Sequence, residues 1–462
     1  MKMDQLEFSD IQGLLLSSYS SLPCAAYLMY EILDAGAASE WLQQILPCIT
    51  NGTQRDKVSS FNIAFTAEGL STLGVDQATL ATFSFAFAEG MTPEYRSRIL
   101  GDTDENRPAA WTWGGPTTQP IHVLLMLFGR DESTLASLVG GPEFAPAGVR
   151  LVIKLEAGRH PDQKEHFGYL DGVGQPVIEG SGNKKRQVNR TGHATEIKPG
   201  EFILGYGNEY GQPSESPSTR LDSRQVLPKN QRGDGDLGRN GSYLVFRHIQ
   251  QRVAQFWNYL DNIARDVNDQ PDPVRREFLG AKLVGRWKSG APLVRTPNAD
   301  DPKLSAANDF EYRRLDSHGL KCPIGAHIRR ANPRNSLGSD EAEAVKSMRR
   351  HRLLRRGRSY GPRQADPMVD DGKDRGLFFI ALSADIERQF EFVQQTWVNN
   401  PTFGGLHGEV DPLVGHKPTQ FTLQAEPVRR RLLGLSAFVA IRGGAYFFLP
   451  GLKALRYLSS LL

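Results

Sequence analysis

Apolar segments of strand length lie in the first half of the chain. Residues 121–128 (Ile-His-Val-Leu-Leu-Met-Leu-Phe) and 149–155 (Val-Arg-Leu-Val-Ile-Lys-Leu) are bounded by glycine and charged residues. Runs of this length and composition predict buried or half-buried strands. The residues between them, 132–138, predict a helix.

The second half has a similar alternation. Residues 376–382 (Gly-Leu-Phe-Phe-Ile-Ala-Leu) predict another strand. A helix with one apolar face is predicted beyond it from four residues at helical spacing, Ile386, Phe390, Val393 and Trp397. Strands and helices mixed in both halves predict the α+β class, and no internal repeat is visible in the sequence.

A stretch with little periodicity separates the two halves. Residues 205–241 are rich in Gly, Ser, Pro and charged residues, which is typical of a domain junction or of a long surface loop beside one. We therefore predict two domains, residues 1–220 and residues 221–462.

Composition and charge narrow the class of protein. The 462 residues are 39% hydrophobic and 23% charged, as in globular proteins, and the length allows two or more domains. The net charge of +3 comes from 55 basic and 52 acidic residues, a balance too even to indicate nucleic acid or an anionic membrane as the main partner. No segment approaches the length needed to cross a bilayer.

Cysteine usage and the first residues predict a cytoplasmic protein. Cys24, Cys48 and Cys322 are too few and too scattered for a disulfide framework, which favours a reducing compartment. Three acidic residues lie among the first ten, where a secretory signal would have a basic stretch leading into an apolar run.

Residues 321–334 (Lys-Cys-Pro-Ile-Gly-Ala-His-Ile-Arg-Arg-Ala-Asn-Pro-Arg) carry the first candidate chemistry. His327 stands among small residues, and arginines follow it up to Arg334. Imidazole is a common axial ligand of haem iron, and guanidinium groups bind carboxylates, of which haem has two. A lone histidine is more often a hydrogen-bonded structural residue, so the motif needs support from elsewhere in the chain.

Two further motifs supply that support. Residues 167–176 (Phe-Gly-Tyr-Leu-Asp-Gly-Val-Gly-Gln-Pro) place Asp171 among glycines, where the backbone can turn tightly beside a flat ligand. Residues 353–362 (Leu-Leu-Arg-Arg-Gly-Arg-Ser-Tyr-Gly-Pro) follow the histidine motif within about thirty residues. Taken singly, the first is typical of an Asp-Gly turn and the second of a solvated basic loop.

The three motifs, in this order, resemble the dye-decolourising peroxidase family of haem enzymes. The resemblance extends to residues 10–13 (Asp-Ile-Gln-Gly) and 443–450 (Gly-Gly-Ala-Tyr-Phe-Phe-Leu-Pro), and so covers nearly the whole chain. It implies two ferredoxin-like domains, each an antiparallel sheet flanked by helices, with haem mainly in the C-terminal half.

The resemblance also implies the cofactor and the substrates. We expect one haem b (heme b) per chain, with hydrogen peroxide and an aromatic reducing substrate, such as a dye or a phenol, as partners. A homo-oligomer is compatible with the resemblance, whereas nucleic acid and membrane are not expected as partners.

On this basis each motif receives a role. His327 would bind the iron, and Asp171 would move the proton needed to break the O–O bond of peroxide. Arg355 would stabilise the departing oxygen, with Arg356 as the alternative. An aspartate has an ordinary pKa of about 3.9 against about 6.5 for histidine, so we expect activity to favour acidic pH.

Three other residues are assigned to the cofactor. Arg334 is expected to contact a haem propionate. Asp385 would accept the hydrogen bond of the ligand histidine, although a helix N-cap is an equally good reading. His166 would reach a propionate or the distal pocket, with an ordinary loop histidine as the more common alternative.

Two competing functions remain open at the level of sequence. Residues 346–358 contain seven Lys or Arg residues and no acid, which is also typical of a nucleic-acid surface. A haem carrier, sensor or iron-removing protein would need His327 and Arg334, whereas only a peroxidase needs Asp171 and Arg355.

Overall fold

The structure is a computed structural model that describes residues 5–54, 57–182 and 196–461. Its main feature is a nine-stranded sheet in the order β10-β12-β11-β4-β1-β3-β2-β15-β9, with a further pairing between β12 and β9 that closes the sheet on itself. The strands are β1 (Cys24–Ile32), β2 (Ser59–Phe65), β3 (Val123–Gly129), β4 (Val149–Gly158), β9 (Ser242–Gln251), β10 (Leu354–Arg355), β11 (Arg358–Tyr360), β12 (Gly376–Ser383) and β15 (Val439–Leu449).

The first half of the sheet has the order β4-β1-β3-β2, with antiparallel neighbours throughout. Helix α2 (Ala35–Ile45) follows β1, and α7 (Glu132–Val139) joins β3 to β4. Numbered along the chain, the strands of this half have the spatial order 4-1-3-2, which is the ferredoxin-like arrangement. Asp34 begins α2 by accepting a hydrogen bond from the Ala37 amide.

The second half repeats that arrangement with different connections. Its main strands have the order β11-β12-β9-β15, again 4-1-3-2 read from the opposite edge when numbered along the chain. Helices α8 (Val253–Ala264) and α9 (Pro273–Val284) follow β9, and a helical segment with two π-helical turns, Glu387–Glu391 and Val393–Val398, follows β12. The fold is therefore α+β with two ferredoxin-like halves, as expected.

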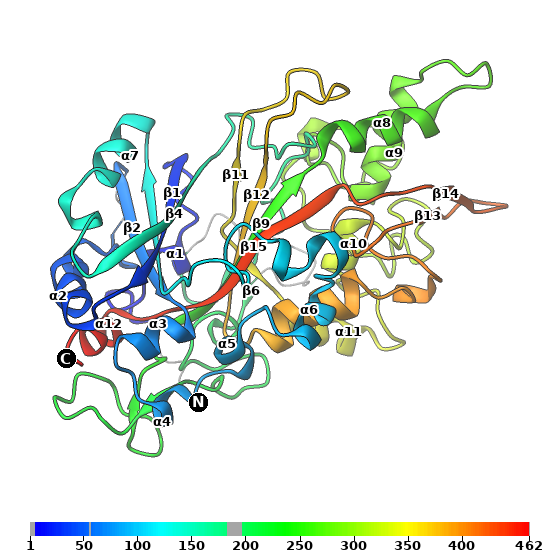
Figure 1. The fold of residues 1–462 in the computed structure, drawn as a ribbon. Coiled ribbons are helices and arrows are strands. Elements are labelled where there is room, and N and C mark those ends of the chain that lie inside the picture. Colours follow the sequence, from blue (N-terminus) through cyan, green and yellow to red (C-terminus); the bar gives the residue numbers. More distant parts are fainter. Residues whose placement is uncertain (1–4, 55–56, 183–195, 462) are drawn as a thin grey trace.

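The two halves meet edge to edge and face to face. Along the edges, Ser359 pairs with Gly158 and Phe448 pairs with Phe65. Between the faces, the ring of Tyr27 on β1 lies 5.2 Å from Phe246 on β9 in an edge-on contact. Figure 1 shows the strands of the first half on the left and those of the second half beside them.

Both faces of the sheets are covered. Residues that point between the sheets, among them Met126 and Phe378, form one buried apolar cluster. Residues of the opposite face, such as Leu28 and Ile63, form another with the helices of the first half. Burial on both faces explains why β3 and β12 appear in the sequence as nearly continuous apolar runs. Strand β4 is more exposed, and charged residues interrupt its apolar ones.

Shorter elements fill the connections. An insertion between β2 and β3 contains α3 (Ala67–Thr72), α4 (Gln77–Leu80), α5 (Phe85–Glu89) and α6 (Glu94–Leu100). The link between the halves, residues 159–241, contains β5 (Val177–Ile178), β6 (Glu196–Ile197), β7 (Ser218–Thr219) and β8 (Gly235–Asp236). The remaining elements are α1 (Gly13–Leu16), α10 (His327–Ala331), α11 (Glu341–Arg350), β13 (Gln420–Leu423), β14 (Arg430–Leu433) and α12 (Leu452–Leu458).

The predicted elements are confirmed where the apolar pattern was strongest. Strands β3, β4 and β12 and helix α7 lie where they were expected, and the four apolar residues after β12 are all buried. The expected boundary at residues 220 and 221 falls within the link and stays a prediction. The ferredoxin-like unit of the first half ends earlier, at Gly158.

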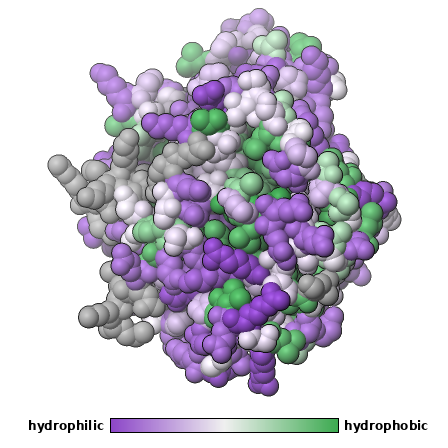
Figure 2. Space-filling view, turned by 90° about the vertical axis from the view of Figure 1, so that its left-hand side faces the viewer, coloured by the Kyte–Doolittle hydropathy of each residue, from purple (hydrophilic) through white to green (hydrophobic). Residues whose placement is uncertain are grey.

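None of the helices in the described residues has the length and apolar character needed to span a membrane. On the face in Figure 2, hydrophilic residues predominate and hydrophobic residues are scattered among them.

A buried ion pair connects the insertion of the first half to the sheet of the second. Nη1 of Arg247 on β9 donates to Oδ2 of Asp102 at 2.6 Å, and Nη2 contacts the other carboxylate oxygen. The two side chains are 6% and 1% exposed. We predict that Asp102→Ala lowers the free energy of unfolding by about 3–5 kcal/mol, because an unpaired guanidinium remains buried.

Urea unfolding measures this loss. The matched control is Arg98→Ala, which removes an ion pair whose side chains are 71% and 81% exposed and should cost less than about 1 kcal/mol. A similarly small loss for Asp102→Ala would contradict the assigned role of the buried pair.

Candidate active site

A cavity of about 680 Å³ lies at the junction of the two halves. Its wall includes residues of the link after β4, of the segment from Arg355 to Ser359, and of the loop from Ser305 to Asp309. The volume suits a ligand of cofactor size. Both Asp171 and Arg355 line it, as predicted for residues that face a bound molecule.

Asp171 is carried by a hairpin that folds around a carboxylate. Residues Lys164 and Leu170 form an antiparallel bridge, and the Asp171 amide donates to the Gln163 carbonyl. Inside the hairpin, the Glu165 carboxylate accepts hydrogen bonds from the amides of Phe167 at 2.8 Å and Tyr169 at 2.9 Å. The side chain of Asp171 is 46% exposed and so remains accessible from the cavity.

Arg355 faces Asp171 from the other half. Its backbone is held by the pairing of β10 with β12, and its Nη1 lies 3.8 Å from Oδ1 of Asp171. Arg356 points elsewhere, because its guanidinium donates to the carbonyls of Leu14 and Leu15. Between the two alternatives that the sequence left open, the structure therefore places Arg355 opposite the aspartate.

His327 is the first residue of α10, and its orientation is fixed by a buried carboxylate. Nδ1 lies 2.9 Å from Oδ2 of Asp411, whose side chain is 0% exposed. The other oxygen of Asp411 accepts from the amides of Leu413 and Val414. With Nδ1 donating to Asp411, the Nε2 atom keeps its lone pair for a ligand.

The electrostatics of this pair follow from its burial. Burial alone would lower the pKa of His327, but the Asp411 carboxylate raises it overall. Burial would likewise raise the pKa of Asp411, yet the imidazole and two amide hydrogen bonds lower it overall. Arg355 lowers and Asp171 raises the pKa of His327 to a smaller extent.

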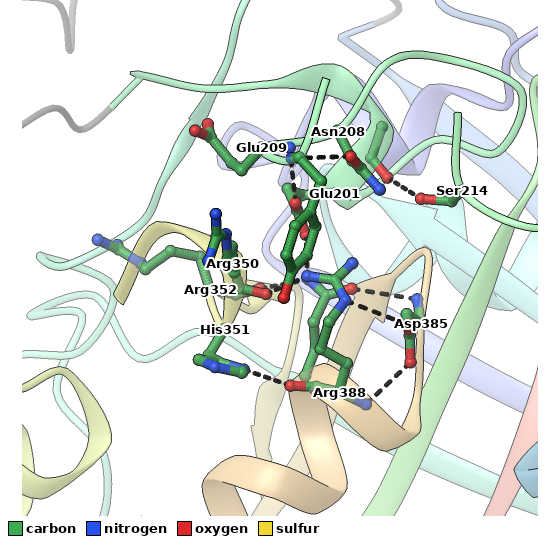
Figure 3. A network of polar contacts seen from close by, with 12 residues as sticks. Glu201, Asn208, Glu209, Ser214, Arg350, His351, Arg352, Asp385 and Arg388 are labelled. Carbon is green, nitrogen blue, oxygen red and sulfur yellow. Dashed lines mark hydrogen bonds and ion pairs between the residues drawn. The ribbon is translucent and has the colours of Figure 1, made fainter. Parts of the chain in front are cut away.

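Asp385 does not accept the hydrogen bond of His327, and that prediction is wrong. Its Oδ1 accepts from the Arg388 amide at 2.8 Å and its Oδ2 from Nε of the same residue at 3.1 Å (Figure 3). Asp385 therefore caps the helical segment after β12, which was the alternative reading. The physical reason is that the helical segment with Ile386 starts here. The backbone amides of its first turn have no partner within the helix and need an acceptor.

Arg334 lies in a group of buried cations. It donates to the carbonyls of Asn308 and Phe310 and to Oδ1 of Asn308, which also accepts from Arg286. Burial and, to a smaller extent, neighbouring Arg334 lower the pKa of Arg286 to about 10. Arg352 is affected by the same positive charges. Its pKa is lowered to about 9 by burial and by Arg334 and Arg355.

These cations suit a ligand that carries carboxylates. Within the described residues, Arg286, Arg334 and Arg352 form no ion pair with an acidic side chain. Carbonyl and amide oxygens accept their hydrogen bonds, so their positive charge remains available to a bound anion. The described residues contain no cluster of three His, Cys, Asp or Glu that could hold a metal ion.

His166 is placed less favourably than predicted. Its Nε2 lies 2.8 Å from the Tyr360 carbonyl and its ring packs edge-on against His160. His160 lines the cavity, whereas His166 is absent from its wall, as are His327 and Arg334. Burial lowers the pKa of His166 to about 4, so the ring is neutral near pH 7. The structure thus favours the alternative of a structural loop histidine.

Asp411 and Arg286 were missed at the level of sequence. Asp411 stands 84 residues after His327, in a Gly-Glu-Val-Asp-Pro loop with no periodic pattern. Arg286 follows Gly285, the glycine that ends α9, and its neighbours in the sequence do not show that it is buried. Each becomes recognisable only through burial and partners, which a single sequence does not display.

Comparison with known proteins agrees with the geometry. Residues 213–405 match a family model described as Dyp-type peroxidase, C-terminal. The chain is 32% identical to the multifunctional dye peroxidase DyP2 of Amycolatopsis, over 86% of this chain and 81% of that protein. It is 30% identical to a dye-decolorizing peroxidase of Mycena epipterygia, over 98% of this chain and 87% of that protein.

A solved structure shows the same likeness in three dimensions. A dye-decolorizing peroxidase in complex with 2,6-dimethoxyphenol superposes with a TM-score of 0.78 at 26% identity, covering 98% of this chain and all of the other (100%). The likeness therefore extends through both ferredoxin-like halves.

The contact between His327 and Asp411 leads to a prediction about titration. In Asp411→Asn the negative charge is removed while burial and Arg355 continue to disfavour the imidazolium, so the pKa of His327 should fall below that of the original protein. NMR titration of ¹³C-labelled histidine rings in the ligand-free protein measures it. Asp385→Asn is the matched control and should leave the pKa of His327 unchanged. A pKa that falls in Asp385→Asn but not in Asp411→Asn would contradict the assignment.

Proposed function

The chain belongs to the Dyp-type peroxidase family, and on that premise we propose which of its residues perform the reaction. It is a haem-dependent peroxidase that reduces hydrogen peroxide and oxidises dyes and phenols. The observation that carries the assignment of residues is the position of Asp171 and Arg355. The two face each other across 3.8 Å in the wall of the cavity, and both influence the titration of His327.

We propose that one haem b is bound per chain. Nε2 of His327 would hold the iron, and Arg334 and Arg286 would neutralise the two carboxylates. The buried guanidinium groups without acidic partners support this placement. When bound, haem supplies the iron at which peroxide is reduced and stores the oxidising equivalents that the donor later consumes.

Asp411 would keep His327 electron-rich. A carboxylate that accepts the Nδ1 proton raises the basicity of the imidazole and holds its ring in one orientation. The 0% exposure of Asp411 and its two further amide donors fix the carboxylate in position. The orientation of Nε2 is thereby set before any ligand arrives.

Asp171 and Arg355 would act on peroxide in the cavity that both residues line. Asp171 would take a proton from one oxygen of hydrogen peroxide and return it to the other, which would leave as water, with the two electrons that this reduction needs coming from bound haem. Arg355 stabilises the negative charge that develops on the departing oxygen. A haem carrier would have no use for this pair, so its presence in the cavity favours catalysis over transport.

We also propose that the enzyme works in the cytoplasm. All three cysteines are free thiols, including the exposed Cys48, which suits a reducing compartment.

The roles of Asp171 and Arg355 can be tested in the haem-loaded enzyme. We predict that Asp171→Asn and Arg355→Leu each lower the second-order rate constant for hydrogen peroxide by about 10²–10⁴-fold, because proton transfer and charge stabilisation are lost. Stopped-flow absorbance in the Soret region measures this rate constant. Asp269→Asn is the control, since the Asp269 side chain is 86% exposed. Rates within twofold of the original enzyme in both site variants would refute the assignment.

Arg334 can be tested through haem retention. Arg334→Leu removes a buried donor expected to pair with a haem carboxylate, and charge-assisted hydrogen bonds of this kind contribute about 1.5–3 kcal/mol. Haem transfer to an excess of a haem-accepting apoprotein should therefore be roughly 10–100-fold faster. Arg314→Leu, at a side chain that is 72% exposed, should transfer haem at the original rate. Equal rates for Arg334→Leu and the original protein would exclude the contact.

A further inference from the structure

The loop that carries Asp171 is packed before the aspartate, at Phe167 and Tyr169, but open at the glycines that follow it. A Cβ atom added to Gly172 or to Gly174 would meet no heavy atom within 4 Å. Gly172 also has a φ of +82°, so the backbone at this point has the freedom that glycine provides. The Gly172 amide donates to Oδ1 of Asp171 at 2.6 Å, but this bond lies within the loop and does not fix the carboxylate relative to the second half.

The ion pair with Arg355 is too weak to do so. The two side chains are 46% and 35% exposed, and their nearest atoms lie 3.8 Å apart. Exposed pairs of this kind contribute about 0–1 kcal/mol, which leaves both groups free to separate.

Two hydrogen bonds from the second half hold the loop instead. Oε1 of Gln175 accepts from the backbone amide of Arg355 at 3.0 Å, and Nη2 of Arg352 donates to the Gly174 carbonyl at 2.8 Å. Gln175 is 8% exposed and Arg352 also 8%, so water competes little for either bond. Gln175 thus joins the loop of Asp171 to the backbone of the residue that Asp171 faces.

The donors belong to a rigid frame. Leu354 and Arg355 pair with Leu382 and Ala381 of β12. The carbonyl of Arg352 accepts from Nε2 of Gln389, which is 0% exposed. Figure 3 shows Arg352 beside the network of Asp385 and Arg388 that begins the same helical segment. The loop of Asp171 is thereby attached to a part of the second half that is fixed by strand pairing and by a buried hydrogen bond.

We propose that Gln175 is a positioning residue for the peroxidase reaction: its side-chain oxygen fixes the distance between Asp171 and Arg355 across the junction of the two halves. The inference rests on the proposed function of these two residues. It adds that the geometry of the pair is set by an amide side chain in the wall of the same cavity. A displacement of about 1 Å in such a pair can cost on the order of 10²-fold in rate.

The test compares three substitutions in the haem-loaded enzyme. Gln175→Leu removes the acceptor, Gln175→Asn withdraws it by one methylene, and Gln175→Glu keeps an oxygen at the same reach. We expect the first two to lower the rate constant for peroxide by roughly 10–100-fold. Gln175→Glu should stay within about threefold of the original enzyme. Gln255→Leu, at an exposed glutamine of α8, is the control.

A second measurement separates positioning from general damage. Hydrogen–deuterium exchange of the peptide that contains Asp171 should accelerate in Gln175→Leu and Gln175→Asn but not in Gln175→Glu, while the Soret spectrum of the resting enzyme stays unchanged. Where Gln175→Leu fails to fold, the contrast between the Asn and Glu variants decides.

Three outcomes would overturn the proposal: unchanged rates in the Leu and Asn variants, unchanged exchange of the loop, or a loss in the Glu variant as large as in the Asn variant. Failure of the proposed function is distinguishable, because the original enzyme would then show no reaction with peroxide that depends on Asp171.

Discussion

The hydrogen bond between His327 and Asp411 is the interaction on which the rest of the site depends. It presents one imidazole nitrogen to a ligand and commits the other to a carboxylate that is fully buried. The contact stabilises the charged form of each partner, because it raises the pKa of the histidine and lowers that of the aspartate. A site that binds its metal through one protein ligand needs that ligand to be oriented in advance.

The duplicated fold explains why the opposing groups come from different parts of the chain. Each half has strands in the order 4-1-3-2, and the two sheets join at their edges through pairs such as Ser359 and Gly158. Directly after Gly158 the chain leaves the first half and forms the hairpin of Asp171, while Arg355 lies just before Ser359 on the adjoining edge. The pairing of the two sheet edges thus brings the Asp171 carboxylate and the Arg355 guanidinium together in the wall of the cavity.

The sequence predicted those features that depend on neighbouring residues and missed those that depend on contacts between distant parts of the chain. Strands β3 and β12 were visible because both faces are buried, and Asp171, Arg355 and His327 stood in motifs with recognisable neighbours. The duplication was invisible, since the two halves share a strand order but have insertions of different length in different places. Asp411 was missed because a hydrogen bond across 84 residues follows no spacing rule. Asp385 was an equal candidate for hydrogen-bond acceptor and for helix cap, because both roles use the same residue type, and the structure shows the cap.

Coordination of iron by His327 is the central claim, and the resonance Raman spectrum of the ferrous enzyme tests it most directly. The account predicts an iron–imidazole stretching band in the original enzyme, its loss in His327→Gly, its return when free imidazole is added, and a shifted band in Asp411→Asn. An iron–imidazole band that persists unchanged in His327→Gly without added imidazole would contradict the account.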